Sequence, residues 1–403
     1  MTARRRFLQG VGVGALASLA AGAAFWKFTD PTRQTQPFYG LHQSGITNLQ
    51  PAAGMVVAFD VLAKDKAQLT DLFKLLTERI AFLTTGGSAP SVDAKLPPMD
   101  SGILGNTVYP DNLTITVSVG ASLFDQRFGL AERRPKHLIR MEGFPNDQLN
   151  PAECHGDLML QFCANSAQTN LHALRDIIKN APKLLAPRWK LEGFLPPHQV
   201  PNPFGFHTPH NFLGFKDGTG NLDIFDEALM NQLVWVNPEH QDVGWATGGS
   251  YQAVRIIRNL VERWDRTPLG EQESLIGRKK DSGALLGHKH EFEEADYGQH
   301  PDTSAVPSNA HIRLANPRTM ATQKHRILRR GYNYSRGITP AGQLDMGLLF
   351  ICYQANLTDG FIHVQNQLNG EELEEYIKPT GGGYYFALPG VQRGDYLGHS
   401  LLA

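Results

Sequence analysis

The sequence predicts an α+β protein built from two similar units, in which strands and helices alternate. In the first unit, residues 54–61 have the pattern of a strand, and residues 65–83 place apolar side chains at helical spacing. In the second unit, residues 250–257 form an expected strand followed by a helix-forming stretch. The segments 157–164 and 346–354 resemble one another, because each is an apolar strand before a helix start. We therefore expect two α+β units that bury a common core by pairing their sheets.

Further elements complete each unit. Strands are expected near residues 113–119 and 189–195, with a helix over 168–180 between them. In the second unit we expect a helix near residues 360–368 and a closing strand at 384–388. The two units therefore share one order of elements along the chain.

The chain is long enough for two domains and a leader. Residues 1–26 are expected to be a signal peptide, and residues 27–50 a linker. A proline-rich stretch near residue 200 marks the expected boundary between a first domain, residues 51–204, and a second, residues 205–403.

The composition is that of a soluble globular protein, with 41% hydrophobic and 19% charged residues. A formal net charge of -1 leaves no basic surplus for binding nucleic acid. Three cysteines are too few for a disulfide framework or a tetrahedral zinc site. A Cys154–Cys163 bridge is conceivable in an oxidising compartment, but buried thiols are favoured.

The N-terminus indicates export. Arg4 to Arg6 precede Phe7 and Leu8, and a short Gly/Ala-rich apolar stretch follows over residues 11–24. This is the pattern of a twin-arginine (Tat) signal, which exports folded proteins that often carry a cofactor. We therefore expect a periplasmic protein whose mature chain has no stable membrane span.

The sharpest motif is residues 214–221, where three glycines surround Asp217 and leave its carboxylate little covered. A phosphate-binding loop would need Gly-Lys-Ser/Thr, and a haloacid-dehalogenase site would need an aspartate where Phe215 stands. A calcium loop would need a glutamate where Ala228 stands. From the residues alone, a functional carboxylate and an ordinary Asx-Gly turn both stay open.

A second motif begins at His311 and runs to Arg318. A helix that starts there must end near Asn316, because Pro317 disfavours helix at the preceding residue. Eighteen residues after His311 comes Arg329. Taken alone, His311 is more often a structural histidine than a ligand.

Together, the turn with Asp217, the motif from His311 to Arg318 and the run 328–332 resemble the three signatures of the dye-decolourising peroxidase family. With the Tat signal and residues 250–271, the resemblance is to its deferrochelatase/peroxidase type, from bacterial ferrous-iron uptake. It extends over most of the mature chain.

That resemblance implies two ferredoxin-like domains forming a dimeric α+β barrel, with one haem b per chain in the C-terminal domain. It implies that His311 is the iron ligand, a neutral imidazole whose other nitrogen donates to a carboxylate. Asp217 and Arg329 would be catalytic: the carboxylate carries a proton between the peroxide oxygens, and the guanidinium stabilises charge on the leaving oxygen. Gly331 stands where some relatives have an asparagine, which leaves the relative importance of Asp217 and Arg329 open.

The resemblance also implies the residues that contact the porphyrin: Gly218, Thr219, Gly220, His311, Asn316, Pro317, Arg318 and Arg329. Arg318 would pair with a propionate, and Arg255 or Arg258 would do the same from the strand.

The expected function is peroxide-dependent oxidation of dyes, phenols or other reductants, with release of iron from haem as a further activity. The alternative is a non-enzymatic periplasmic haem carrier. Electrons from bulky reductants would pass through surface aromatic residues, for which the candidates are Trp235, Trp245, Trp264, Tyr251 and Tyr332. The expected partners are a second copy of the chain, an iron permease and a periplasmic iron-binding protein.

Overall fold

The fold comes from a computed structural model that describes residues 30–90, 93–196, 208–295, 297 and 304–403. The predicted signal peptide, residues 1–26, therefore lies outside the described residues, and so does most of the proline-rich stretch near residue 200. The domain boundary at 204/205 stays a prediction.

The first half contains the predicted elements, with ends moved by a few residues. They are β1 (Ala53–Val61), α2 (Lys66–Thr85), β4 (Thr114–Gly120), β5 (Leu158–Ala164), α3 (Ala167–Asn180) and β6 (Leu185–Phe194). A two-stranded hairpin, β2 (Gly87–Ser88) and β3 (Thr107–Val108), branches off after α2.

The second half contains more helices and strands than the sequence predicted. Its strands are β7 (Ser250–Asn259), β8 (Leu328–Arg329), β9 (Tyr332–Ile338), β10 (Leu344–Gln354) and β11 (Ile377–Ala387). Its helices are α4 (Glu227–Leu233), α5 (Val261–Trp264), α6 (Leu269–Ile276), α7 (His311–Ala315), α8 (His363–Gln367) and α9 (His399–Leu402). A π-helical turn, Thr358–Ile362, leads into α8.

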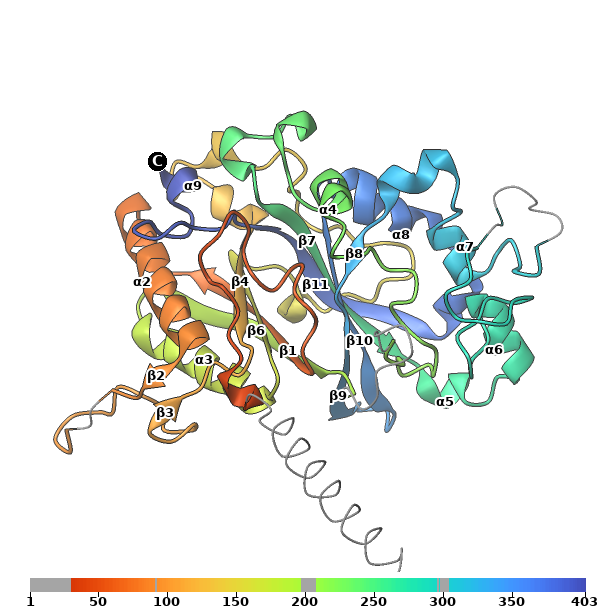
Figure 1. Ribbon diagram of the computed structural model, residues 1–403, viewed down its shortest axis with the longest axis horizontal. Coiled ribbons are helices and arrows are strands. Elements are labelled where there is room, and N and C mark those ends of the chain that lie inside the picture. The colour runs from red at the N-terminus through yellow and green to blue at the C-terminus, as the bar shows by residue number, and fades with distance from the viewer. Residues whose placement is uncertain (1–29, 91–92, 197–207, 296, 298–303) are drawn as a thin grey trace, which may run out of the picture.

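The strand order confirms the predicted fold class. The first half has the order β6-β1-β5-β4 and the second half β11-β7-β10-β9, which is the same ferredoxin-like arrangement twice. The halves join where β11 pairs with β4 and where β6 pairs with β9. Because β7 pairs with both β11 and β10, the sheet closes on itself. Figure 1 shows this central sheet with α2 and α3 on one side and α5 to α8 on the other.

The helices of the first half form for local reasons. Asp65 caps α2 by accepting a hydrogen bond from the backbone N–H of Gln68 at 2.9 Å. The face of α2 that carries Leu69, Phe73 and Ile80 is fully buried against the sheet. This helical layer and the sheet form the larger apolar core of the molecule.

The segment before β1 packs onto the barrel. Ile46 is fully buried, and the Gln43 side chain donates to the carbonyl oxygens of Val117 and Leu388, each at 2.8 Å. The three cysteines are buried and free, so the conceivable Cys154–Cys163 bridge is not formed.

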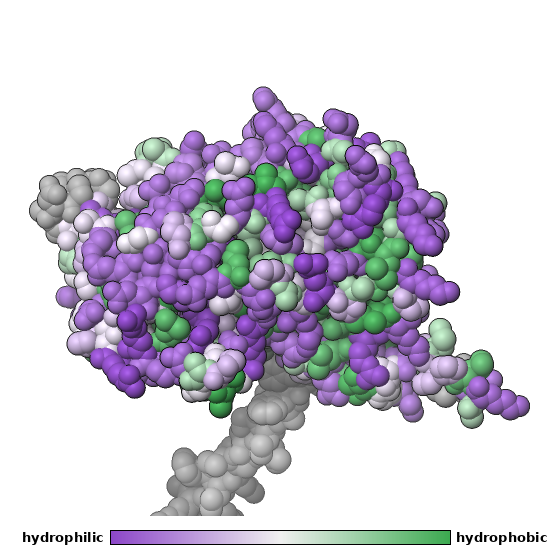
Figure 2. Space-filling model, turned by 180° about the vertical axis from the view of Figure 1, so that it is seen from behind, coloured by the Kyte–Doolittle hydropathy of each residue, from purple (hydrophilic) through white to green (hydrophobic). Residues whose placement is uncertain are grey.

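The rear face of the molecule is mainly polar (Figure 2). Figure 2 shows hydrophilic residues over most of the rear face, with apolar residues gathered toward one side. Within the described residues, no helix has both the length and the apolar character that crossing a membrane requires.

Candidate active site

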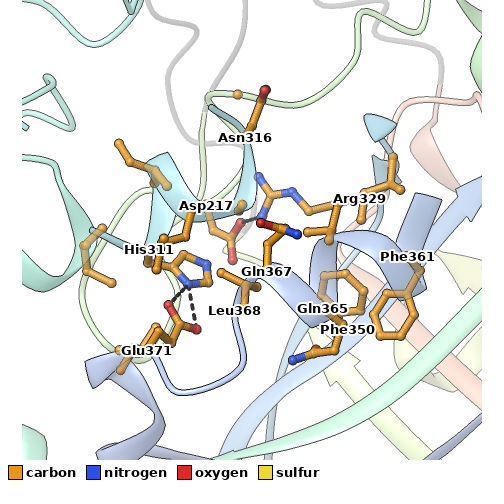
Figure 3. A pocket seen from close by; sticks show the side chains of 18 of the residues that line it. Asp217, His311, Asn316, Arg329, Phe350, Phe361, Gln365, Gln367, Leu368 and Glu371 are labelled. Carbon is orange, nitrogen blue, oxygen red and sulfur yellow. Dashed lines mark hydrogen bonds and ion pairs between the residues drawn. The ribbon is translucent and has the colours of Figure 1, made fainter. Parts of the chain in front are cut away.

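A cavity of ≈ 570 Å³ lies in the second half of the molecule. Its floor is made of residues from three strands of the barrel: Ile257, Asn259, Leu348, Phe350, Ile377 and Pro379. Its walls come from α7, from α8 and from residues 208–222, which we call the aspartate turn. Figure 3 shows part of this lining, with Asp217, Arg329 and His311 close together.

The aspartate turn presents Asp217 to the cavity. The Asn211 side chain accepts a hydrogen bond from the Phe215 backbone N–H at 3.2 Å, which closes a tight loop before Asp217. Gly214 has a φ of +83°, and a Cβ there would lie 2.4 Å from Cε of Lys280. The Lys280 side chain can move, but the positive φ strains any residue with a side chain, so the backbone conformation explains the glycine at this position.

Arg329 meets Asp217 inside the cavity. Its Nη1 donates to Asp217 Oδ1 at 2.6 Å. The Asn221 side chain fixes the arginine, since its amide donates to the Arg329 carbonyl at 2.8 Å and accepts from the Arg329 N–H at 2.9 Å. The structure thus brings together the two residues predicted to be catalytic. Sequence reasoning did not single out Asn221, although it ends the glycine motif.

His311, the first residue of α7, lies in the same cavity (Figure 3). Its Nδ1 is 2.8 Å and 3.0 Å from the two carboxylate oxygens of Glu371, whose side chain is only 3% exposed. Burial alone would lower the pKa of His311, but the charge and hydrogen bond of Glu371 outweigh it and raise that pKa. The carboxylate predicted to hold the histidine is therefore Glu371, a residue 60 positions away that the sequence did not identify.

The other predicted contact residues also line the cavity: Gly218, Thr219, Gly220, Asn316, Pro317 and Arg318. Arg318 has a φ of +58°, a region that residues other than glycine rarely adopt. Its Nε is buried, and no hydrogen-bond partner for it exists among the described residues. An unpaired buried donor of this kind points to an anionic group that binds in the cavity.

Two further arginines, Arg278 and Arg326, line the cavity beside Arg318. Burial and the charge of Arg318 lower the pKa of both guanidinium groups. This excess of positive charge suits a ligand with carboxylates. The sequence suggested Arg255 or Arg258 for this role, and that suggestion was wrong.

Neither of those two arginines reaches the cavity. Arg255 is buried in an ion pair with Asp147, and Arg258 donates to Gln343. The predicted electron-relay residues also need correction, because Trp235, Trp245, Trp264, Tyr251 and Tyr332 are all buried. None of them can be the exposed end of a relay.

The donor set fits a metal porphyrin. Within the described part of the chain, no group of three or more His, Cys, Asp or Glu side chains could hold a bare metal ion. A single imidazole suits a metal whose other positions are filled by the macrocycle. Apolar lining residues such as Phe350, Phe361 and Leu368 suit the faces of the macrocycle, and the arginines suit its carboxylates.

Comparison with known proteins agrees with this geometry. Residues 43–195 match the family model "Dyp-type peroxidase, N-terminal", and residues 208–392 match "Dyp-type peroxidase, C-terminal". The chain belongs to the Dyp-type peroxidase family. It is 56% identical to the deferrochelatase of Yersinia pseudotuberculosis, over 99% of this chain and 94% of that protein. It is also 56% identical to an Escherichia coli deferrochelatase, over 99% of this chain and 96% of that protein.

Solved structures of Dyp-type peroxidases also superpose on this chain. The DyP-type peroxidase of Cellulomonas bogoriensis superposes with a TM-score of 0.81 at 32% identity, over 93% of this chain and 99% of that one. Ferric DtpA from Streptomyces lividans superposes with a TM-score of 0.82 at 31% identity, with the same coverage. This Dyp-type peroxidase is therefore a haem-dependent oxidoreductase. The alternative of a non-enzymatic haem carrier is not supported.

Proposed function

We propose that this enzyme reduces hydrogen peroxide at a haem b held by His311, with Asp217 and Arg329 as the catalytic pair. One observation carries the proposal: the Asp217–Arg329 ion pair and the His311–Glu371 pair face the same cavity. A protein that only binds haem needs the histidine, but it has no use for the acid and the arginine.

His311 would be the protein ligand to the iron. With Nδ1 donating to Glu371, the neutral imidazole keeps its Nε2 lone pair free for the metal. The buried carboxylate also fixes the plane of the ring and makes the imidazole a stronger donor. Glu371 is thus a positioning residue for the ligand.

Arg318, Arg326 and Arg278 would bind the porphyrin carboxylates. Arg318 is the strongest candidate, because its buried Nε lacks a partner in the described structure. The turn Gly218–Thr219–Gly220 would pass beside the macrocycle, where two residues without side chains allow close approach. Asn316 and Pro317 would line its edge.

The proton chemistry belongs to Asp217 and Arg329. Bound haem supplies the electrons that reduce peroxide and takes electrons back from the reductant. The Asp217 carboxylate would accept a proton from one peroxide oxygen and return it to the other, which leaves as water. The Arg329 guanidinium would donate hydrogen bonds to that leaving oxygen and stabilise the charge that develops there.

Removal of iron from haem, with the tetrapyrrole left intact, is a second activity that we propose for the same pocket. It is supported by 56% identity over 99% of the chain to proteins named deferrochelatase. In this step two protons from solvent would replace Fe²⁺ on the porphyrin nitrogens, so the haem must be ferrous. The test is to incubate the enzyme without oxygen with haem that dithionite has reduced and with a ferrous-iron chelator, and to measure the fluorescence of metal-free porphyrin. Porphyrin at the level of a protein-free control would contradict this activity.

We also propose that the enzyme is exported to the periplasm by the Tat route, on the evidence of Arg4 and Arg5. The resemblance to the ferrous-iron uptake type supports a homodimer that works with an iron permease and a periplasmic iron-binding protein. Replacing both arginines with lysine should retain the chain in the cytoplasm, which cell fractionation would detect.

The deciding experiment uses protein purified after expression with added haem. We expect a ferric Soret band that changes when peroxide is added and returns when a reducing dye is supplied. The Asp217→Asn and Arg329→Leu variants should keep the Soret band but react with peroxide about 10² to 10⁴ times more slowly in stopped flow. If both variants react at the wild-type rate, the assignment of the catalytic pair is wrong.

A further inference from the structure

Between α6 and α7 the structure describes residues 277–295, 297 and 304–310, and we call these described residues the cover segment. Five of its residues pack into a small apolar cluster of their own: Leu285, Ala295, Tyr297, Val306 and Ala310. On one side it contacts α7, where Ile312 packs against this cluster and the Arg313 guanidinium donates to the Val306 carbonyl at 2.8 Å. The described parts of the segment are therefore anchored next to His311.

On the other side, the cover segment reaches the aspartate turn at two points: Lys280 lies over the Phe215 ring, and Glu291 contacts the residues that flank Asp217. Glu291 Oε2 lies 2.5 Å from Nζ of Lys216, and Glu291 Oε1 accepts a hydrogen bond from the Thr219 hydroxyl at 2.9 Å. The Glu291 side chain is only 8% exposed. Burial alone would raise the pKa of Glu291, but hydrogen bonds from Lys216, Thr208 and Thr219 outweigh it and lower that pKa. The carboxylate is thus ionised at neutral pH.

The two residues that Glu291 holds stand on either side of Asp217 and Gly218. Gly218 has a φ of +130°, so this stretch of backbone has little steric restraint of its own. The backbone around Glu291 is in turn fixed by Arg278, whose Nη1 donates to the carbonyls of Gly283 at 2.6 Å and Glu291 at 3.2 Å. A rigid support therefore holds the turn at the two points that flank the carboxylate.

Lys216 matters because it precedes Asp217 in the sequence and is a second cation that lines the same cavity. In the structure Asp217 pairs with Arg329, while the ammonium of Lys216 is taken up by Glu291. Without Glu291, the Lys216 side chain, which is 23% exposed, would carry an uncompensated positive charge in a partly buried site. The carboxylate of its sequence neighbour would then be an available counter-ion.

We propose that Glu291 is a positioning residue for Asp217: it holds Lys216 and Thr219 and so keeps the Asp217 carboxylate paired with Arg329 rather than with Lys216. This inference rests on the proposed role of Asp217 as the proton carrier.

The test is a double-mutant cycle on the haem-loaded protein. Glu291→Gln keeps the size of the side chain and an oxygen to accept from Thr219, but it removes the charge that holds Lys216. We expect the second-order rate constant with peroxide and the affinity of the ferric protein for cyanide each to fall about tenfold. In a Lys216→Met background the same Glu291→Gln change should cost less than about twofold, because no free ammonium remains. Glu291→Asp, which retains the charge, should lose less than Glu291→Gln.

Two results would overturn the role of Glu291. An equal loss in both Lys216 backgrounds would mean that Glu291 only supports the fold, and no loss in either would mean that it positions nothing. The Soret absorbance per chain and the melting temperature of each variant separate these effects from loss of haem or of structure. Asp217→Asn serves as the reference. If that variant is slow while Glu291→Gln is normal, only the present inference fails, whereas a normal Asp217→Asn overturns the proposed function itself.

Discussion

The two halves of the barrel share one topology, but their helical layers differ. In the first half, α2 and α3 run for 20 and 14 residues and cover the sheet without a break. In the second half, the corresponding connections contain α5, α6, α7 and α8, which run for only 4, 8, 5 and 5 residues. The cavity lies between the short helices α7 and α8 and strands β7, β10 and β11. The same sheet thus supports a closed core in one half and a ligand site in the other.

A pair of histidines shows the difference at the level of side chains. In α3, His172 is 1% exposed and its Nε2 lies 2.7 Å from the Asp100 carboxylate. In α7, His311 has a similar bond to Glu371 but is 31% exposed toward the cavity. The bond to a carboxylate is common to both, so it is the neighbouring space that makes one histidine a candidate ligand.

The largest expected effect tests that contrast directly. His311→Ala should abolish haem binding, because it removes the metal ligand, while the apoprotein still folds. His172→Ala should keep one haem per chain but lose about 1 to 2 kcal/mol of stability, since the partly buried Asp100 carboxylate loses one hydrogen bond and keeps the one from the Gly102 N–H. Soret absorbance per chain and chemical denaturation measure the two outcomes. Full haem occupancy in the His311 variant would remove the basis of the ligand assignment.

A smaller effect is expected at the arginines. Arg318→Ala should weaken haem affinity about 10- to 100-fold, because a charged hydrogen bond contributes about 1.5 to 3 kcal/mol. Arg79, which binds Asp176 through two hydrogen bonds at 2.8 and 2.7 Å and so joins α2 to α3, is the matched control. Arg79→Ala should reduce stability and leave haem affinity unchanged. Transfer of haem to an excess of apomyoglobin gives the affinities, and equal losses in both variants would contradict the assignment of Arg318.

The smallest effect concerns pH. His42 is stacked on Trp235 at 3.9 Å, and burial lowers its pKa although Gly248 accepts a hydrogen bond from it. As pH falls, His42 therefore takes up a proton in the unfolded chain at a higher pH than in the folded chain. Its contribution to stability is complete above the unfolded-state pKa of about 6.5 and is lost as pH falls below that value. His42→Gln should reduce the drop in melting temperature of the apoprotein between pH 7 and pH 5.5 by about 1 to 2 °C.

The same measurement extends the comparison to the second half. His363 is stacked on His325 at 3.6 Å on the edge of the cavity, and burial together with the charge of His325 lowers its pKa. His363→Gln should also reduce the drop in melting temperature between pH 7 and pH 5.5, but by less than His42→Gln, because His363 is the less buried of the two. A larger effect at His363 would show that the cavity edge, and not the packed segment before β1, dominates the acid response.

Much of the fold could be predicted from the periodicity of apolar residues in the sequence. The remaining elements could not be predicted in this way. The helix now found at Lys66–Thr85 and the strand Leu158–Ala164 had regular apolar patterns, so both were predicted within a few residues. Strand β9 was missed, because the residues from Ser335 to Ile338 are exposed and show no buried face. That the halves are ferredoxin-like came from the family resemblance, since periodicity does not order strands in a sheet.

The residues of the site also fall into those that the sequence predicted and those that it did not. Asp217, His311 and Arg329 stand in motifs that can be recognised along the chain. Glu371 begins an acidic run in which four of five residues through Glu375 are glutamates, and nothing local distinguishes it as the partner of His311. Arg255 was a poor choice because its side chain pairs with Asp147, a contact across 108 residues, and Arg258 was one because its side chain donates to Gln343. Partners that meet only after folding carry no signal in one sequence.

The closure of the sheet also determines how the chain can be divided. The seams between the halves are narrow: β6 meets β9 through the single pair Phe194–Asn333, and β11 meets β4 through three pairs. Separating the halves would nevertheless open four strand edges at once, and open edges template aggregation. Neither half should therefore be a viable fragment on its own. A circular permutant that opens the chain between β6 and β7 keeps every strand neighbour, so it should preserve the barrel and its cavity.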